Sequence, residues 1–232
     1  MHPNEKEIRH KLAITHHVIA HFGWDELVAT HVSARIPDTD TVLITPKDTA
    51  FNNVTARNLV LVNLEGNILS DNGHAVLKQA ANIHLATYKI RHDIHCIIHT
   101  HSMYPTIVSS LAAGFQFTTQ HSLRFYDDIA YHQFNGLALE NEGAAIANDL
   151  GDKKILFARN HGVITTGCSV EDAIYSHYHI ENCCKVLVNT LQCGVRMIDI
   201  PHDTCKLTKQ QFDKIKTPEV EFQHFTALVT SA

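Results

Sequence analysis

The spacing of apolar and polar positions predicts a chain that mixes helices with short strands. Apolar residues recur at three- and four-residue intervals, typical of amphipathic helices, over 4–22, 76–89, 104–113, 142–150 and 169–191. Short β-branched or apolar runs predict strands at 42–46, 59–63, 67–69, 94–98, 129–131, 154–158 and 163–166. Strands mixed with covering helices indicate a layered α/β or α+β domain.

The ends of several predicted helices carry their own signals. Gly23 and Gly151 follow the last apolar positions of two helices, where glycine commonly ends a helix. Ser169 and Asp172 mark the start of the longest one. We expect one domain over residues 1–205 and a C-terminal tail, 206–232, with a candidate short helix at Lys209–Lys214.

Composition narrows the class of protein. The 232 residues are 44% hydrophobic and 19% charged, as in a globular domain with an ample core. The net charge is −5 and no basic run exceeds two residues, so we expect no nucleic-acid partner. No apolar run has the length of a membrane span, and the first residues carry no apolar signal segment. Six cysteines without a C-x-x-C spacing indicate free thiols and a cytoplasmic location.

Histidine is unusually common, which weakens any single histidine pattern. With 19 histidines in the chain, chance alone gives roughly 1.5 His-x-His pairs, and two occur. His177 and His179 lie within a predicted helix, where residues two apart point to different faces. His99 and His101 end a predicted strand, where residues two apart share a face. Only the second pair can chelate one metal ion.

A third histidine supports this interpretation. His161 lies in the short Asn-His-Gly turn between two predicted strands. Three neutral imidazoles can hold one divalent metal ion and leave a coordination position for a substrate. The alternative is that these rings only pack or form hydrogen bonds.

Several ordered motifs resemble the class II aldolase/adducin family. They are Asn-Gly-His-Ala at 72–75, the segments 82–88 and 91–93, Ile-Ile-His-Thr-His-Ser at 97–102, and Arg-Asn-His-Gly-Val at 159–163. Upstream, 31–35 and 43–46 are similar to the glycine-loop and threonine-proline elements of that family. The resemblance covers roughly residues 8 to 195.

This resemblance implies a fold, an assembly and a metal centre. The fold is a three-layer α/β domain, with a central, mostly antiparallel sheet covered by helices on both faces. The assembly is a homotetramer with active sites at subunit interfaces. Each subunit would hold one divalent metal ion, zinc in most members, with manganese or iron as alternatives, and the metal ligands fall on His99, His101 and His161.

Departures from the aldolase pattern point to the adducin-related branch, which the segment 125–132 also resembles. The catalytic acid of the aldolases falls at Ala80, which cannot ionise. Their phosphate-binding serine pair falls at Lys78 and Gln79, and the asparagine of their phosphate loop falls at His31. The metal ligands are therefore kept, whereas the proton donor and the phosphate site are not.

Replacement groups must come from elsewhere in the chain. His132, Tyr131 and Gln120 are the candidates for proton transfer, because the resemblance places their segment near the metal. An imidazole suits this task at neutral pH. The alternative for Tyr131 and His132 is a structural role at a strand end.

Four residues are candidates for substrate binding. They are His31 in the phosphate-loop position, Lys47 after the threonine-proline element, Lys78 and Arg124. Arginine suits bidentate anion contacts. For the three cationic residues, solvated surface positions are the alternative.

Two further side chains have structural interpretations. His84, one helical turn beyond Ala80, is expected to be a buried, hydrogen-bonded core histidine, with support of a metal ligand as the alternative. Glu181 is expected in a solvated or interface salt bridge, with the orientation of a metal ligand as the alternative.

The leading hypothesis is a metal-dependent lyase, aldolase-like or decarboxylase-like. It would act through a metal-stabilised enediolate or carbanion on a small hydroxy-carbonyl or sugar-derived substrate. A non-catalytic, adducin-like module for assembly or protein binding is the alternative. Loss of the acid at Ala80 favours this module, and the three retained histidines oppose it. Oxygen chemistry at an iron ion is a third hypothesis.

Overall fold

The fold is built on one mixed seven-stranded sheet. The computed structural model describes residues 4–137 and 142–230. The strands are β1 (His31–Arg35), β2 (Thr41–Ile44), β3 (Val60–Asn63), β4 (Cys96–Thr100), β5 (Ile129–His132), β6 (Ile155–Ala158) and β7 (Gly162–Gly167). Their order is β3-β2-β1-β4-β7-β6-β5, and every neighbouring pair is antiparallel except β5 and β6. The expected mostly antiparallel sheet is confirmed.

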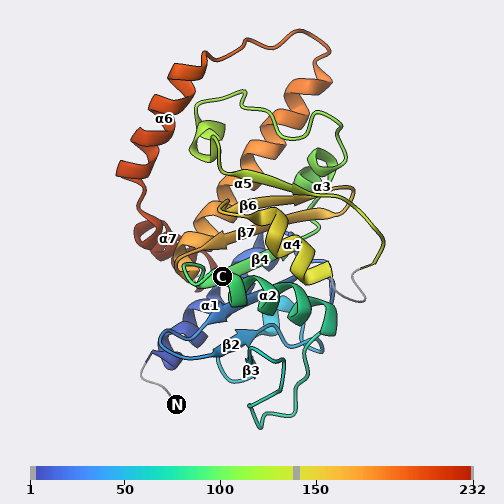
Figure 1. The fold of residues 1–232 in the computed structure, drawn as a ribbon. Helices are drawn as coiled ribbons and strands as arrows, with labels where there is room; N and C mark the ends of the chain where they lie inside the picture. The colour runs from blue at the N-terminus through green and yellow to red at the C-terminus, as the bar shows by residue number, and fades with distance from the viewer. Residues whose placement is uncertain (1–3, 138–141, 231–232) are drawn as a thin grey trace.

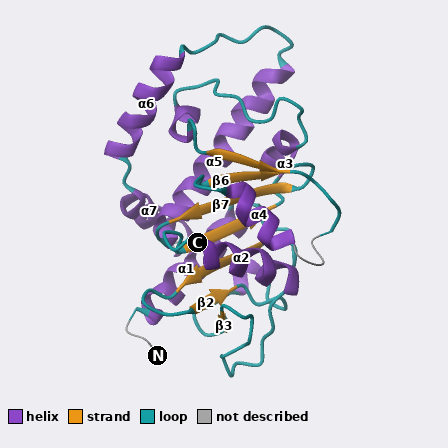
Figure 2. Cartoon of the chain, in the orientation of Figure 1, coloured by secondary structure: helices purple, strands orange, loops and turns teal. Residues whose placement is uncertain are grey.

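Helices cover both faces of this sheet (Figures 1 and 2). The elements are α1 (Glu5–His21), α2 (Lys78–Ile90), α3 (Met103–Ser109), α4 (Glu142–Leu150), α5 (Val170–Gln192), α6 (His202–Ile215) and α7 (Pro218–Thr230), with short 3-10 helices η1 (Phe51–Asn53) and η2 (His121–Phe125). Side chains of α2 and α4 pack in one core cluster. Those of α1, α5 and α7 pack on the opposite face. No helix in the described ranges has the length and apolar character to cross a bilayer.

The central strand β4 explains why His99, one of the predicted metal ligands, lies inside the protein. All five of its residues are buried, because helices cover the sheet on both sides. Cys96 and Ile98 pack towards α1 and α5, whereas Ile97 packs towards α2 and α4. Strand side chains alternate between faces. His99 therefore lies on the α2 and α4 side.

The start of α5 follows the pattern expected from the sequence. The Ser169 side chain accepts a hydrogen bond from the backbone N–H of Asp172 at 3.1 Å. The Asp172 carboxylate, in turn, pairs with Lys216 at 3.0 Å. The N-terminal end of this long helix is thus tied both to its own first turn and to the C-terminal segment.

The C-terminal segment differs from the expected tail with one short helix. It forms two helices, α6 and α7, and α6 begins at His202. Phe222 and Phe225 of α7 are buried against α1 and α5. Short helices are marginal on their own and depend on tertiary packing. The sequence pattern could not show α7 because its partner surface is built by α1 and α5, which lie far earlier in the chain.

Helices α2 and α4 approach closely at Gly143, and this contact is testable. A Cβ atom at Gly143 would lie 2.3 Å from the carbonyl oxygen of Asn82, a backbone atom. We expect Gly143→Ala to lower the free energy of unfolding by about 1–3 kcal/mol in urea titrations, because the helices must separate. Ala144→Ser, at an exposed position on the same helix, is the control and should change little. Equal stability of both variants would contradict this packing.

Candidate metal centre

Three imidazole rings meet beside the C-terminal end of β4. His99 lies on β4, His101 directly follows the strand, and His161 directly precedes β7. The possible ligand atoms of the three side chains all lie within 4.8 Å of one another. Their ring centroids are 4.8 Å apart for His99 and His101, 4.9 Å for His99 and His161, and 4.5 Å for His101 and His161. The structure thus brings together the three residues predicted as metal ligands.

Strand pairing produces this convergence. Antiparallel pairing of β4 with β7 sets Thr100 opposite Val163, so the end of one strand lies beside the start of the other. Asn160 has a φ of 56°, which closes the tight turn before β7. A Cβ atom at Gly162 would lie 2.3 Å from the carbonyl oxygen of Thr100, so only glycine allows this close approach. His161 is thereby held against the end of β4.

Hydrogen bonds orient two of the rings towards each other. Nδ1 of His99 donates to the carbonyl oxygen of Val163 at 3.0 Å. Nδ1 of His101 donates to a carboxylate oxygen of Glu26 at 2.7 Å. In neutral rings both Nε2 atoms then carry only lone pairs, yet they lie 2.9 Å apart. A cation between them relieves this opposition, and three imidazoles are a donor set typical of zinc.

Burial keeps the rings of His99 and His161 in the form that binds metals. Burial lowers the pKa of His99 far below its usual value, and the neighbouring histidines lower it further. It also lowers the pKa of His161 to about 4. Metal binding requires a neutral imidazole. The site is therefore prepared for a cation at neutral pH, without a proton to displace from either ring.

A cavity of about 220 Å³ opens at the triad. Its polar lining consists of the three histidines, His31 and Gln79. The remaining lining residues are small or apolar: Ala29, Leu77, Ile83, Phe134, Gly136 and Leu137. The cavity therefore combines a possible metal position with largely apolar walls, as small-molecule sites commonly do.

The candidates for proton transfer separate in the structure. His132 packs against α4, where Nδ1 contacts Asp149 at 2.7 Å and Nε2 contacts Glu142 at 3.3 Å. It lies on the sheet face that carries the triad. The Tyr131 hydroxyl instead accepts a hydrogen bond from the backbone N–H of Phe115 at 2.9 Å, on the opposite face. Strand alternation explains the separation, because adjacent residues point to opposite sides.

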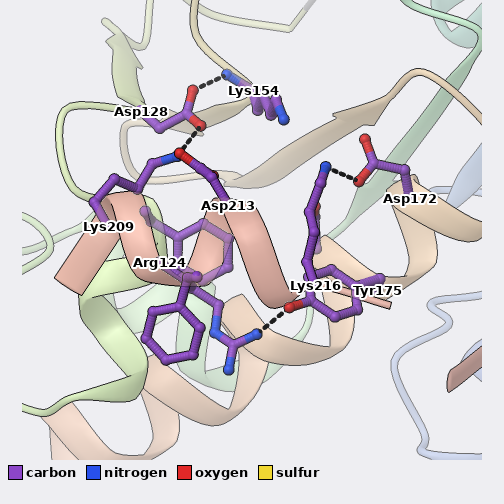
Figure 3. Close-up of a pocket in the computed structure, with 11 residues that line it drawn as sticks. Arg124, Asp128, Lys154, Asp172, Tyr175, Lys209, Asp213 and Lys216 are labelled. Atoms are coloured by element: carbon purple, nitrogen blue, oxygen red, sulfur yellow. Dashed lines mark hydrogen bonds and ion pairs between the residues drawn. The ribbon is translucent and has the colours of Figure 1, made fainter. Parts of the chain in front are cut away.

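Gln120 and Arg124 lie away from the triad cavity in this chain. Gln120 directly precedes η2, and Arg124 lies within it. The Arg124 guanidinium donates to the Tyr175 hydroxyl at 2.6 Å and stacks on the Phe212 ring at 4.4 Å. Figure 3 shows Arg124 in a separate polar pocket beneath α6. Its guanidinium group is engaged by Tyr175 and Phe212, so the structure does not bring Arg124 to the histidine cluster.

The two lysine candidates lie at the surface. Lys78 is exposed at the start of α2, between Leu77 and Gln79, which both line the cavity. Lys47 is exposed, and its backbone N–H donates to the carbonyl oxygen of Ala75 at 2.9 Å. Neither lysine is among the described residues that line the cavity.

Sequence reasoning missed Glu26 as a partner of the site. Glu26 lies in the loop between α1 and β1, and its side chain is 61% exposed. No motif marks this position. The pairing of His31 with His99 places β1 beside β4, and the loop before β1 thereby reaches His101. Only the tertiary structure could show this contact.

Glu181 is buried, contrary to its expected place in a solvated or interface salt bridge. It accepts a hydrogen bond from the Ser102 hydroxyl, and burial raises its pKa to about 8. His177 lies 3.6 Å away and bridges Thr165 and Thr100. Buried polar side chains of α5 thus contact the end of β4, the strand that carries His99, from the face opposite His99.

Comparisons with known proteins agree with this architecture. Residues 10–188 match the model of the Class II Aldolase and Adducin N-terminal domain. The chain belongs to the class II aldolase and adducin family. The resemblance inferred from its motifs is therefore confirmed.

Several relatives illustrate the range of this family. A putative aldolase class 2 protein of Pseudomonas aeruginosa is 34% identical over 85% of this chain and 76% of its own length. Mouse alpha-adducin is 36% identical over 81% of this chain, which spans only 26% of that protein.

Solved structures show the same fold. An aldolase II superfamily protein from Pseudomonas syringae has a TM-score of 0.93 and 31% identity, with 99% of this chain and 94% of that chain covered. L-fuculose 1-phosphate aldolase from Glaciozyma antarctica PI12 has a TM-score of 0.87 and 26% identity, with 97% and 89% covered.

The contact between Glu26 and His101 predicts a specific effect on metal affinity. We expect Glu26→Gln to weaken binding of Zn²⁺ by about tenfold, because carboxylate partners of ligating histidines typically contribute 10–100-fold. His101→Ala should abolish binding and leave the fold intact. Chelator competition measures the affinity, and circular dichroism checks the fold. Glu219→Gln, at an exposed position on α7, is the control. Unchanged metal stoichiometry in His101→Ala would contradict the assignment.

The buried histidines predict acid sensitivity in metal-free protein. Burial lowers the pKa of His177 to about 3, below the value near 6.5 of an unfolded chain. Between these values unfolding takes up a proton, so the free energy of unfolding falls as the pH falls. We expect His177→Gln to reduce this slope by about 1.4 kcal/mol per pH unit between pH 4 and 5.5. Urea titrations across this range measure it. Exposed His10→Gln is the control, and equal slopes in both variants would refute the interpretation.

Proposed function

We propose that this protein is a metal-dependent lyase that acts on a small hydroxy-carbonyl or sugar-derived substrate by aldol cleavage or decarboxylation. The observation that carries the proposal is the three-imidazole cluster at the mouth of a largely apolar cavity. A pure scaffold has no need for three histidines whose bare nitrogen atoms converge. Membership of the class II aldolase and adducin family supports the same class of chemistry.

In this proposal His99, His101 and His161 hold one divalent ion, with zinc as the first candidate and manganese or iron as alternatives. The ion supplies Lewis acidity, which stabilises negative charge developing next to a carbonyl group. Val163 and Glu26 keep the Nδ1 hydrogens of two ligands engaged, so that their Nε2 atoms remain available. The apolar walls of the cavity exclude water from the reacting groups.

His132 is our proposed proton-transfer residue. It is the candidate from the sequence that lies on the face of the triad, and two carboxylates of α4 hold both of its ring nitrogens. Ala80, at the position of the usual acid, is buried and cannot contribute. None of the three candidates lines the described cavity, but Tyr131 points to the opposite face and Gln120 lies next to η2. We therefore assign proton transfer to His132 alone.

The proposal extends to the assembly and location of the protein. We propose a cytoplasmic homotetramer, as implied for the family, without a nucleic-acid or membrane partner. Exposed apolar side chains on α3, Met103 at 70% and Ile107 at 38%, support burial in a subunit contact. An adducin-like binding module is the second candidate, supported by the identity to alpha-adducin. The convergent triad favours the enzyme.

An anaerobic activity assay tests the proposed reaction. Zn²⁺-loaded protein is incubated with phosphorylated and free hydroxy-carbonyl compounds, and released aldehyde and CO₂ are measured. We expect conversion that stops on chelation and returns with metal, and no conversion by His161→Ala. His132→Asn should lower kcat by about 100-fold with unchanged metal affinity, because general acid–base catalysis contributes 10²–10⁴-fold.

Three outcomes would contradict the proposal. Conversion that survives chelation would exclude the metal centre, and conversion that appears only when iron-loaded protein is assayed in air would indicate iron-dependent oxygen chemistry. Failure of fully metal-loaded protein to convert any compound would favour the binding module.

A further inference from the structure

A chain of buried side chains extends from the cavity wall into the core. His31 lines the cavity, and its Nδ1 lies 2.9 Å from Nε2 of His84 on α2. Nδ1 of His84 lies 2.6 Å from the Ser33 hydroxyl, which lies 2.9 Å from the Tyr88 hydroxyl. The Tyr88 hydroxyl also contacts the Ser33 carbonyl oxygen at 3.1 Å. All four residues are at most 5% exposed.

The last contact determines the direction of every other hydrogen bond in the chain. A carbonyl oxygen only accepts, so the Tyr88 hydroxyl donates to the carbonyl of Ser33. The Tyr88 oxygen must then accept the Ser33 hydroxyl hydrogen, and the Ser33 oxygen must accept from Nδ1 of His84. A neutral His84 therefore has a bare Nε2, which accepts from Nδ1 of His31. This assignment satisfies all four contacts with neutral rings, the form that burial favours.

The same hydrogen-bond directions leave the Nε2 lone pair of His31, a residue that lines the cavity, without a partner among the described residues. With its hydrogen on Nδ1, a neutral His31 carries an unprotonated Nε2, and this atom makes no hydrogen bond within the described residues. The His31 ring lies beside the triad, with its centroid 4.9 Å from that of His99. His31 therefore offers a hydrogen-bond acceptor to whatever ligand occupies the cavity next to the metal position.

Among the described residues, the lining of the cavity carries no lysine or arginine charge to pair with a phosphate ester. An acceptor lone pair repels a phosphate oxygen, whereas it matches a hydroxyl hydrogen. Leu77, Ile83 and Phe134 give the cavity apolar walls, and Gln79 adds one uncharged amide to the lining. Charge and hydrogen-bond direction thus favour a substrate whose end next to His31 is uncharged and carries a free hydroxyl group.

We propose that His31, held in one tautomer by His84, Ser33 and Tyr88, selects an unphosphorylated substrate that presents a free hydroxyl group to its Nε2 atom. This inference rests on the proposed function, because it concerns the second end of a substrate bound at the same site. His31 is here a specificity-determining residue, and His84 is the positioning residue behind it.

Three matched hydroxamates test the proposal in the wild-type protein. Each chelates a metal ion through its hydroxamate group. The other end of the probe carries a hydroxyl group in glycolohydroxamate, a methyl group in propionohydroxamate and a phosphate group in phosphoglycolohydroxamate. The visible spectrum of Co²⁺-loaded protein reports binding. We expect the hydroxyl probe to bind about five- to tenfold more tightly than the methyl probe, as one hydrogen bond allows. The phosphate probe should bind more weakly than the hydroxyl probe.

Variants locate the origin of the preference. In His31→Leu the hydroxyl and methyl probes should bind equally, and His84→Leu should reduce the preference because the His31 tautomer is no longer fixed. Co²⁺ affinity should stay unchanged in both, and His10→Leu is the exposed control. Tighter binding of the phosphate probe in wild type, or a preference that survives His31→Leu, overturns this inference but leaves the proposed function standing. If Co²⁺ is not bound or no probe changes its spectrum, the proposed function fails and this inference fails with it.

Discussion

The antiparallel pairing of β4 with its two neighbours is the constraint on which the site depends. Pairing with β7 brings His161 to His99 and His101, and pairing with β1 brings His31 beside His99. Since β4 is the middle strand of the sheet, with helices on both faces, these rings meet in a protected interior. A shift of one residue in the register would point His99 to the α5 side and separate it from α2.

Burial then determines the chemical state of the rings. Desolvation lowers the pKa of His31, His84 and His99 so far that the neutral imidazole is the stable form at neutral pH. Neutral rings need defined hydrogen-bond partners, and the structure supplies them from a carbonyl oxygen, a carboxylate and a chain of hydroxyl groups. The same interior that prepares a metal centre also gives the cavity wall a fixed acceptor.

The site combines a cluster of three histidines with side chains that depart from the aldolase pattern inferred from the sequence. Ala80, where the sequence comparison expects the acid of the aldolases, is buried and cannot ionise. His31 and His84 instead form a hydrogen-bonded pair between β1 and α2. The chain is similar both to an adducin and to an aldolase, so a family name alone does not decide the reaction. The side chains of the cavity carry that information.

The sequence alone determined the layered fold, the start of α5 at Ser169 and the three converging histidines. Local periodicity and a capping residue indicate the layers and the helix start, and the motifs that resemble the family mark the three histidines as one ligand set. The pairing of β4 with β7 then brings their rings together. The tertiary structure decided the contact of Glu26 with His101, the separation of Tyr131 from His132, and the docking of α7. It also decided the tautomer of His31, through residues up to 57 positions away. Such contacts arise from strand pairing and burial between distant segments, for which no local pattern exists.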